Sequence, residues 1–316
     1  IPFYSSGTSM YAHNVSAIDN NAHDNTAYGF TAMDGMTTGD KNTAIGFQAG
    51  SAINSGSDNT ILGAYAGDAI TSGQFNVAIG RSALGAEDTH SGNIAIGFQA
   101  LTVQNAGADA YNVAIGHQAG LNVSTGVQNT IIGGLAGDAL TTGVDNVAVG
   151  YLSLSAANAG NRSVAIGKGS LESQNAGSAG QNRYNVAVGY NSGNQITTGT
   201  QTVLIGANAG DALTTGDANI FIGYNAGGLL VTGSRNVGIG DHSLASINSS
   251  EGRNTAVGFG TLTSQDSATD AYNVAVGYKV GEDITTGVQN TMIGGFAGDS
   301  LTTSTGNVSV GYASLS

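Results

Sequence analysis

The stretch NVAIGHQAGLNVSTGVQNTIIGGLAGDALTTGVDNVAVG, residues 112–150, repeats one pattern three times. Each copy opens with Asn, continues with an apolar triplet and closes with Gly, and successive copies are seventeen residues apart. β-Branched residues dominate the triplets, and apolar residues do not recur at helical spacing. A fixed period of this size with strand-forming triplets predicts a parallel β-solenoid in which each repeat forms one coil.

The pattern extends along almost the whole chain of 316 residues. The Gly that closes each triplet, called the anchor Gly below, occurs seventeen times, at positions 29, 46, 63, 80, 97, 116, 133, 150, 167, 189, 206, 223, 240, 258, 277, 294 and 311. Of the sixteen intervals twelve are seventeen residues long, and the others are 18, 19, 19 and 22. The sequence therefore predicts an all-β fold, a parallel β-solenoid or β-roll of about 17 coils.

The predicted solenoid occupies residues 25–316, and stacking at about 4.8 Å per coil predicts a rod on the order of 80 Å long. Residues 1–24 fit the repeat poorly and are interpreted as an N-terminal cap or junction. The chain stops in mid-coil at Ser316. Because a solenoid needs capped ends to stay soluble, we expect the shaft to be open at its C-terminal end and to belong to a longer rod.

The recurring polar and small residues have structural explanations. Gly supplies the positive φ or the close backbone approach that a corner needs. The Asn at the head of each triplet is expected to hydrogen-bond the same Asn of the next coil and form a ladder, which lapses at Ser163 and Thr202. The residue four after the anchor Gly alternates in pairs, Gly-Gly then Leu-Leu, which indicates a duplicated block of four coils.

Strand side chains alternate between two faces, so the first and third residues of each triplet share one face. The third residue is apolar in all seventeen copies, and this predicts that the first and third residues form the core of the coil. The middle residue is Ala in ten copies and is never charged, so we expect another protein surface to cover it. The simplest partner is a second copy of the chain around a common axis, although a protruding corner folded back over the stripe is an alternative. The predicted oligomer-axis residues are Ala44, Ile61, Ala78, Ala95, Ala114, Ile131, Ala148, Ala165, Ala187, Leu204, Phe221, Ala256, Ala275 and Met292.

Composition excludes several classes of function. The formal net charge of −13 repels phosphate backbones and anionic membranes, so no nucleic-acid partner is expected. No stretch approaches the roughly 18 apolar residues of a membrane span, so no membrane insertion is expected either. The absence of Cys excludes disulfides and thiol chemistry.

The triplets Ser163-Val164-Ala165-Ile166-Gly167 and Asn112-Val113-Ala114-Ile115-Gly116 resemble the head repeats of trimeric autotransporter adhesins. That resemblance, which covers Asn25 to Ser316, implies parallel β-rolls of three chains packed around one axis and attachment to a surface. The coils here are longer than the usual head repeat, and the sequence contains no coiled-coil stalk or membrane anchor. The block NTAIGFQAG…NTILGAYAG, residues 42–67, also resembles the repetitive stretches of bacteriophage tail-fibre proteins, which the duplicated blocks fit better.

A search for chemistry finds no catalytic constellation. The histidines at 13, 23, 90, 117 and 242 are scattered, with no paired carboxylate or nucleophile at a recurring offset, and no phosphate-binding loop, zinc-protease motif or nucleophile elbow occurs. The sequence therefore predicts no enzyme activity, no metal site and no cofactor. The adjacent acidic pairs Glu87-Asp88 and Glu282-Asp283 are expected to be solvated at corners. Asp68, Asp138, Asp211 and Asp299 recur only once per block, too sparsely for a ladder of calcium ions.

The residue after the anchor Gly is often aromatic, which favours a rim that shields an interface or a corner. Stacked rings also bind sugars, and the candidate glycan-contacting residues are Tyr151, Tyr190, Tyr224 and Tyr278.

The sequence as a whole predicts the structural shaft of a phage tail fibre, which extends a receptor-binding tip and takes part in host attachment. The expected partners are the chain itself, as a homotrimer, and a glycan or protein receptor on a cell surface. The expected location is the virion surface, or the outside or surface of a cell. Two alternatives remain open: the adhesive head of a bacterial trimeric adhesin, and a subunit of an extracellular filament.

Overall fold

The computed structural model describes residues 4–6, 9–11, 22–175, 180–246 and 252–316. It is an all-β, parallel β-solenoid with a period of about seventeen residues, which confirms the predicted fold class, and the described residues contain no helix. Accordingly, no helix in the described part of the chain is long and apolar enough to cross a membrane. The chain divides into two compact units, Ile1–Asn161 and Arg162–Ser316.

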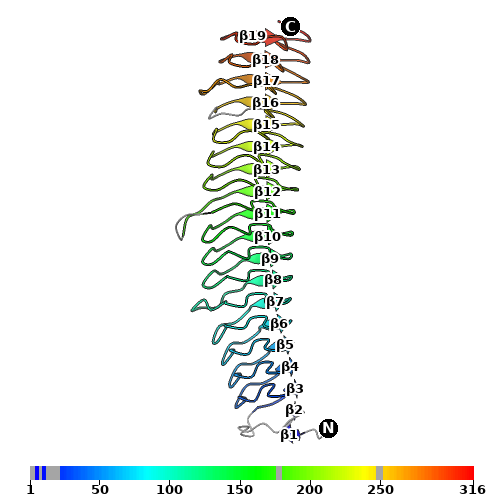
Figure 1. Ribbon diagram of the computed structural model, residues 1–316, viewed down its shortest axis with the longest axis vertical. Helices are drawn as coiled ribbons and strands as arrows, with labels where there is room; N and C mark the ends of the chain where they lie inside the picture. Colours follow the sequence, from blue (N-terminus) through cyan, green and yellow to red (C-terminus); the bar gives the residue numbers. More distant parts are fainter. Residues whose placement is uncertain (1–3, 7–8, 12–21, 176–179, 247–251) are drawn as a thin grey trace. The chain divides into compact units, whose positions relative to one another are not determined.

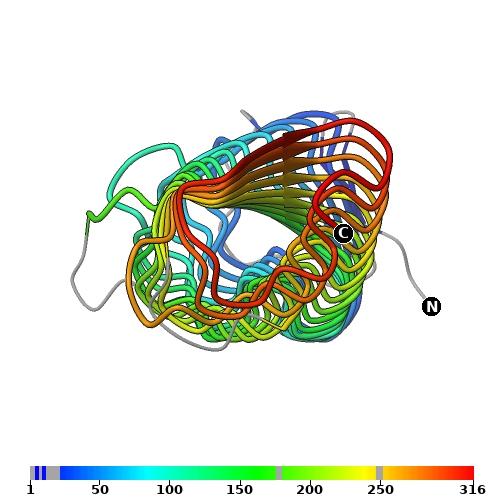
Figure 2. The same ribbon diagram turned by 90° about the horizontal axis from the view of Figure 1, so that it is seen from above.

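Within each unit, the short strand of one coil lies next to the strand of the preceding coil (Figures 1 and 2). The strands of the first unit are β1 (Tyr4–Ser6), β2 (Ser9–Tyr11), β3 (Thr26–Tyr28), β4 (Thr43–Ile45), β5 (Thr60–Leu62), β6 (Val77–Ile79), β7 (Ile94–Ile96), β8 (Val113–Ile115), β9 (Thr130–Ile132) and β10 (Val147–Val149). Those of the second unit are β11 (Val164–Ile166), β12 (Val186–Val188), β13 (Val203–Ile205), β14 (Ile220–Ile222), β15 (Val237–Ile239), β16 (Thr255–Val257), β17 (Val274–Val276), β18 (Thr291–Ile293) and β19 (Val308–Val310).

The register of the sheet matches the sequence repeat. Parallel pairing sets each triplet directly beside the next, for example Ala44 beside Ile61 and Ile45 beside Leu62. The segment 1–24, predicted as a cap or junction, contributes two strands to the first unit. β1 pairs antiparallel with β2, and β2 pairs in parallel with β3. The remainder of that segment falls largely on residues 1–3, 7–8 and 12–21, outside the described residues.

The predicted Asn ladder is present in both units. Asn129 donates from its backbone N–H and its side-chain Nδ2 to Oδ1 of Asn112, at 2.9 and 3.1 Å, and from Nδ2 to the carbonyl of Gly143 at 2.9 Å. At Thr202, where the ladder was predicted to lapse, the Thr hydroxyl replaces the Asn side-chain amide and donates to Oδ1 of Asn185 at 2.8 Å. The ladder therefore satisfies buried polar groups between coils instead of leaving them to water.

Close stacking of successive coils requires Gly at the anchor position. Gly63 has a φ of +136°, and a Cβ at this position would lie 2.7 Å from the carbonyl oxygen of Gly80 in the next coil. Any other residue would clash with backbone and adopt a strained conformation. Each coil therefore requires Gly at this corner.

The predicted assignment of the two strand faces is wrong. The middle side chains point into the chain's own coil, and in β4 to β18 they are completely buried. This holds for every residue predicted to line an oligomer axis: Ala44, Ile61, Ala78, Ala95, Ala114, Ile131, Ala148, Ala165, Ala187, Leu204, Phe221, Ala256, Ala275 and Met292. The first and third residues of the triplets, predicted to be core, are half-buried or exposed. The physical reason is that side chains from other parts of the coil, such as Ile53 and Leu84, already fill much of the narrow interior, so that Ala suffices at most middle positions.

The alternation of Gly and Leu four residues after the anchor Gly follows from the same narrow core. Leu84 is buried in the coil whose middle residue is Ala78, whereas Gly227 occurs in the coil whose middle residue is Phe221. A Cβ on Gly227 would lie 2.6 Å from the Phe221 ring. Where the middle residue is small as well, the residue seven after the anchor Gly compensates: Gly50 lies against Ile53, whereas the coils of Leu84 and Leu101 have Glu87 and Gln104 there.

Candidate functional site

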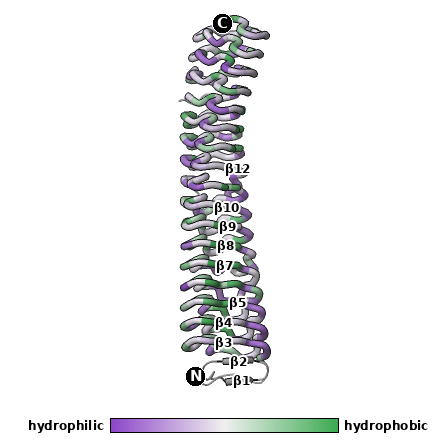
Figure 3. The backbone as a smooth tube through the Cα atoms, turned by 90° about the vertical axis from the view of Figure 1, so that its right-hand side faces the viewer, coloured by the Kyte–Doolittle hydropathy of each residue, from purple (hydrophilic) through white to green (hydrophobic). Residues whose placement is uncertain are grey.

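In each unit, one side of the β-strands faces outward and forms a surface of uniform composition. We call it the strand face and define it as the first and third residues of the triplets in β3 to β10 and in β11 to β19. Its third-residue members include Leu62, Ile132 and Ile205, which are 44, 37 and 39% exposed. The strand face consists of Val, Ile, Thr, Leu and a single Tyr, without any charged residue. Figure 3 shows how hydrophobic positions of neighbouring coils line up within a unit.

An aromatic column adjoins the strand face. In the second unit six rings follow one another from coil to coil at centroid distances of 5.3 to 6.3 Å, namely Tyr224, His242, Phe259, Tyr278, Phe296 and Tyr312. The Phe259 and Tyr278 rings are stacked with 11° between their planes. His242 and Tyr278 also stack against the two faces of Phe259, whereas the Phe296 ring is inclined by 73 and 84° to its two neighbours. These contacts stabilise the stack of coils.

The four candidate glycan-contacting tyrosines are all about half exposed, but the structure does not gather them into one site. Tyr224 and Tyr278 belong to the aromatic column of the second unit, and the ammonium of Lys168 lies 5.7 Å from the ring centroid of Tyr190. Tyr151 belongs to the first unit. Their role in binding a glycan stays a prediction.

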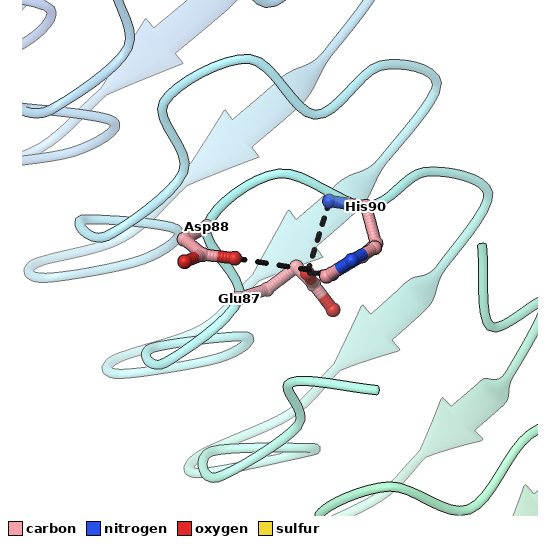
Figure 4. A group of neighbouring side chains, drawn as sticks. All are labelled: Glu87, Asp88 and His90. Carbon is pink, nitrogen blue, oxygen red and sulfur yellow. Dashed lines mark hydrogen bonds and ion pairs between the residues drawn. The ribbon is translucent and has the colours of Figure 1, made fainter. Parts of the chain in front are cut away.

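The corner between β6 and β7 contains a group of side chains that the sequence reasoning missed. Glu87, Asp88 and His90 each offer an atom that can bind a metal ion, and these three atoms lie within 4.8 Å of one another (Figure 4). The described residues contain one such group of three. One prediction is wrong here: Glu87 is completely buried instead of solvated. Its carboxylate is paired with His90.

Hydrogen bonds hold this group in place. Oε1 of Glu87 accepts from the backbone N–H of His90 at 3.1 Å and lies 2.8 Å from His90 Nδ1, while Oε2 lies 3.4 Å from Nδ2 of Asn93. Oδ1 of Asp88 accepts from the N–H of Thr89 at 2.7 Å and lies 3.8 Å from His90 Nδ1. Burial raises the pKa of the Glu87 carboxyl above its ordinary value, and the hydrogen bonds and charge of His90 oppose that shift.

An alignment of the coils contains the signal that reveals this corner. The position of Glu87, seven residues after the anchor Gly, is occupied by Ile53 and Ile70 in the two preceding coils, both completely buried. Other coils have buried Gln at this position, as at Gln104 and Gln265, so the column is buried in those coils too and the carboxylate of Glu87 is the exception in it.

The second acidic pair stays at the surface. Asp283 is exposed, and Glu282 is half-buried and bonded to Nζ of Lys279 at 2.9 Å. Among the recurring aspartates, partial burial raises the pKa of Asp68, Asp138 and Asp211. Each of these three occupies a coil of its own, so the structure does not bring them together.

The chain matches no protein family, no curated protein and no solved structure in comparisons of these three kinds.

Proposed function

We propose that the chain is the structural shaft of a bacteriophage tail fibre that assembles as a homotrimer, carries a receptor-binding part away from the particle and takes part in host attachment. The observation that carries this proposal is the strand face, an uncharged column of mostly apolar side chains that are half-buried or exposed in each unit. The sequence resemblance to tail-fibre and trimeric adhesin repeats supports the same function and predicts a location at the virion or cell surface.

The strand face is large enough for a stable contact between copies. Burying a whole Val or Ile side chain removes roughly 60–120 Å² of apolar surface from water. With about a third of each side chain exposed over the thirty-four positions, the faces of the two units together offer on the order of 1,000 Å² per chain. A standard interface buries about 800 Å² per partner, so the strand face has the size of one such contact, which a trimer divides between two neighbours. The absence of charge on the face also lets chains with a net charge of −13 meet without direct repulsion there.

The proposed mechanism is mechanical. Ladders of Asn side chains and backbone hydrogen bonds tie each coil to the next, so that a load along a unit is shared by many bonds. The aromatic column adds contacts between coils at the corner. A stack of this kind resists bending because every coil is bonded to both neighbours.

Light scattering behind a sizing column tests the proposal. The chain is expected to have three times its mass of 31.3 kDa. The double variant Ile132→Lys and Ile205→Lys, which places one charge on the strand face of each unit, is expected to be monomeric with an unchanged circular dichroism spectrum. A matched control with Thr125→Lys and Thr215→Lys at exposed corners is expected to stay trimeric. A monomeric wild-type chain would rule out the shaft as proposed.

The exposed tyrosines favour a second candidate function, the adhesive head of a surface adhesin. The two functions differ in whether the trimer itself binds a ligand. On an array of bacterial surface glycans and extracellular-matrix proteins, a shaft binds nothing. An adhesive head binds, and loses its ligand when Tyr151, Tyr190, Tyr224 and Tyr278 are changed to Ala.

A further inference from the structure

The corner that carries Glu87, Asp88 and His90 differs from the corner of the preceding coil at all three positions at once. In the preceding coil, the residues at the same three positions are Ile70, Thr71 and Gly73. An apolar residue, a Thr and a Gly have thus been replaced together by two carboxylates and an imidazole. These are the residue types that bind divalent transition metals, and they occur on one side of a single corner.

Structural needs of the corner do not account for a charged residue at position 87. Other coils have Gln at this place, and its amide oxygen performs the local hydrogen bonding. Gln104 accepts from Nδ2 of Asn112 at 2.7 Å, and Gln265 accepts from Nδ2 of Asn273 at 2.6 Å. Glu87 performs this role poorly, because its Oε2 lies 3.4 Å from Nδ2 of Asn93. A buried carboxylate costs more free energy than an amide unless a cation compensates it.

The charges and distances of the corner suit a divalent ion. Two carboxylates carry two negative charges, which one protonated imidazole balances only in part. The distances from His90 Nδ1 are 2.8 Å to Glu87 Oε1 and 3.8 Å to Asp88 Oδ1. Ligand atoms of a tetrahedral zinc ion at about 2.05 Å are about 3.3 Å apart, midway between these two distances. Small side-chain rotations thus bring all three atoms to bonding distance.

From this juxtaposition we infer that Glu87, Asp88 and His90 form a binding site for a divalent transition-metal ion of the Zn²⁺ class. Glu87 and Asp88 supply carboxylate oxygens and His90 supplies Nδ1, which leaves a fourth position for water. The bound ion ties positions 87, 88 and 90 of one corner together and compensates the buried charge of Glu87. It stabilises the first unit because the unfolded chain does not hold the three ligands in place.

Calorimetric titration with ZnCl₂ after removal of metal with a chelator tests this inference on the full chain. The wild-type chain is expected to bind one Zn²⁺ per chain, and bound Zn²⁺ is expected to raise its melting temperature. His90→Gln is expected to weaken binding at least tenfold. The triple variant Glu87→Gln, Asp88→Asn and His90→Gly gives this corner the residues of the following coil, Gln104, Asn105 and Gly107. That coil has Leu101 where this one has Leu84, so the variant is expected to fold and to bind no Zn²⁺ at this corner.

His117→Gln is the matched control, because it removes another histidine of the same unit and is expected to leave affinity and stoichiometry unchanged. The inference is overturned if the wild-type chain binds no Zn²⁺. It is equally overturned if the triple variant binds Zn²⁺ with wild-type affinity and stoichiometry, because the ion is then held elsewhere.

Discussion

Single residues of this protein are constrained mainly by the coil above and the coil below. Asn129 illustrates the point, since all of its polar atoms are directed to neighbouring coils. It donates to Asn112 and Gly143, and its Oδ1 accepts from the N–H and Nδ2 of Asn146, both at 3.1 Å. Because Asn129 is buried, water cannot replace these bonds when the side chain is removed.

Asn129→Ala is therefore expected to destabilise the chain by at least about 2 kcal/mol, because it leaves buried donors and an acceptor without partners. Chemical denaturation followed by circular dichroism measures the change. Asn129→Thr is the control: the hydroxyl of Thr202 occupies the same column and keeps one bond to the preceding Asn, so Thr is expected to cost clearly less than Ala. Equal losses for Ala and Thr would show that the ladder bonds contribute little.

A second prediction at this scale concerns Asp138, whose Oδ1 is buried without a hydrogen-bond partner. Burial raises the pKa of Asp138 above the ordinary value of 3.8, so ionisation of this group opposes folding. The penalty is absent below pH 3.8, grows as the pH rises through the folded-state pKa, and is complete above it. Asp138→Asn removes the penalty and is expected to raise the melting temperature at pH 7 but not below pH 3.8.

The pH series of melting curves needs a reference substitution at an exposed carboxylate. Asp283→Asn serves this purpose, because Asp283 lies on the surface. We expect a much smaller change from it at pH 7. A gain for Asp138→Asn that persists unchanged at low pH would contradict the electrostatic explanation.

At the scale of one coil, the sequence predicted the strand, the corner Gly and the Asn ladder, because each has a distinct residue type at a fixed spacing. It did not predict which strand face is inside. The alternation of side chains along a strand indicates only that Val113 and Ile115 lie on one face and Ala114 on the other. The larger residues are the ones predicted to form the core, but the space inside this coil next to the strand is narrow, and Ala114 fills it. Glu87 was misjudged for a related reason, since an acidic pair in a loop is usually solvated and only its column shows that it is buried.

The compensation of volumes between neighbouring coils gives a prediction about coupled substitutions. A Cβ on Gly238 would lie 3.0 Å from Cδ1 of Phe221 in the preceding coil and 3.0 Å from the Ser243 hydroxyl oxygen. Gly238→Ala is therefore expected to cost about 1–2 kcal/mol, and Phe221→Ala alone about 3–5 kcal/mol. In the Phe221→Ala background, Gly238→Ala is expected to become stabilising, because the added methyl group fills vacated space.

A double-mutant cycle on these two positions measures the coupling by chemical denaturation. The sign of the Gly238→Ala effect is the decisive quantity. If Gly238→Ala destabilises the wild-type chain and the Phe221→Ala variant equally, the Phe221 ring is not the reason that position 238 requires Gly.

At the scale of the whole molecule, the middle column predicted self-association and the resemblance implied a trimer, and the structure changes which residues can mediate it. The middle column is closed inside each coil, so only the outward residues of the strands remain for contact between copies. The corner with Glu87 is separate from the strand face, which consists only of strand residues. Metal binding and assembly are therefore expected to vary independently.

The central claim is that the strand face points outward and joins copies of the chain. The chain has no Cys, so a single Ile132→Cys substitution gives one thiol on this face, and its maleimide labelling rate can be followed as a function of protein concentration. The account predicts fast labelling in dilute solution and strong protection once the chain assembles, while Ile131→Cys stays unreactive at every concentration. A labelling rate for Ile132→Cys that does not change with concentration would contradict it.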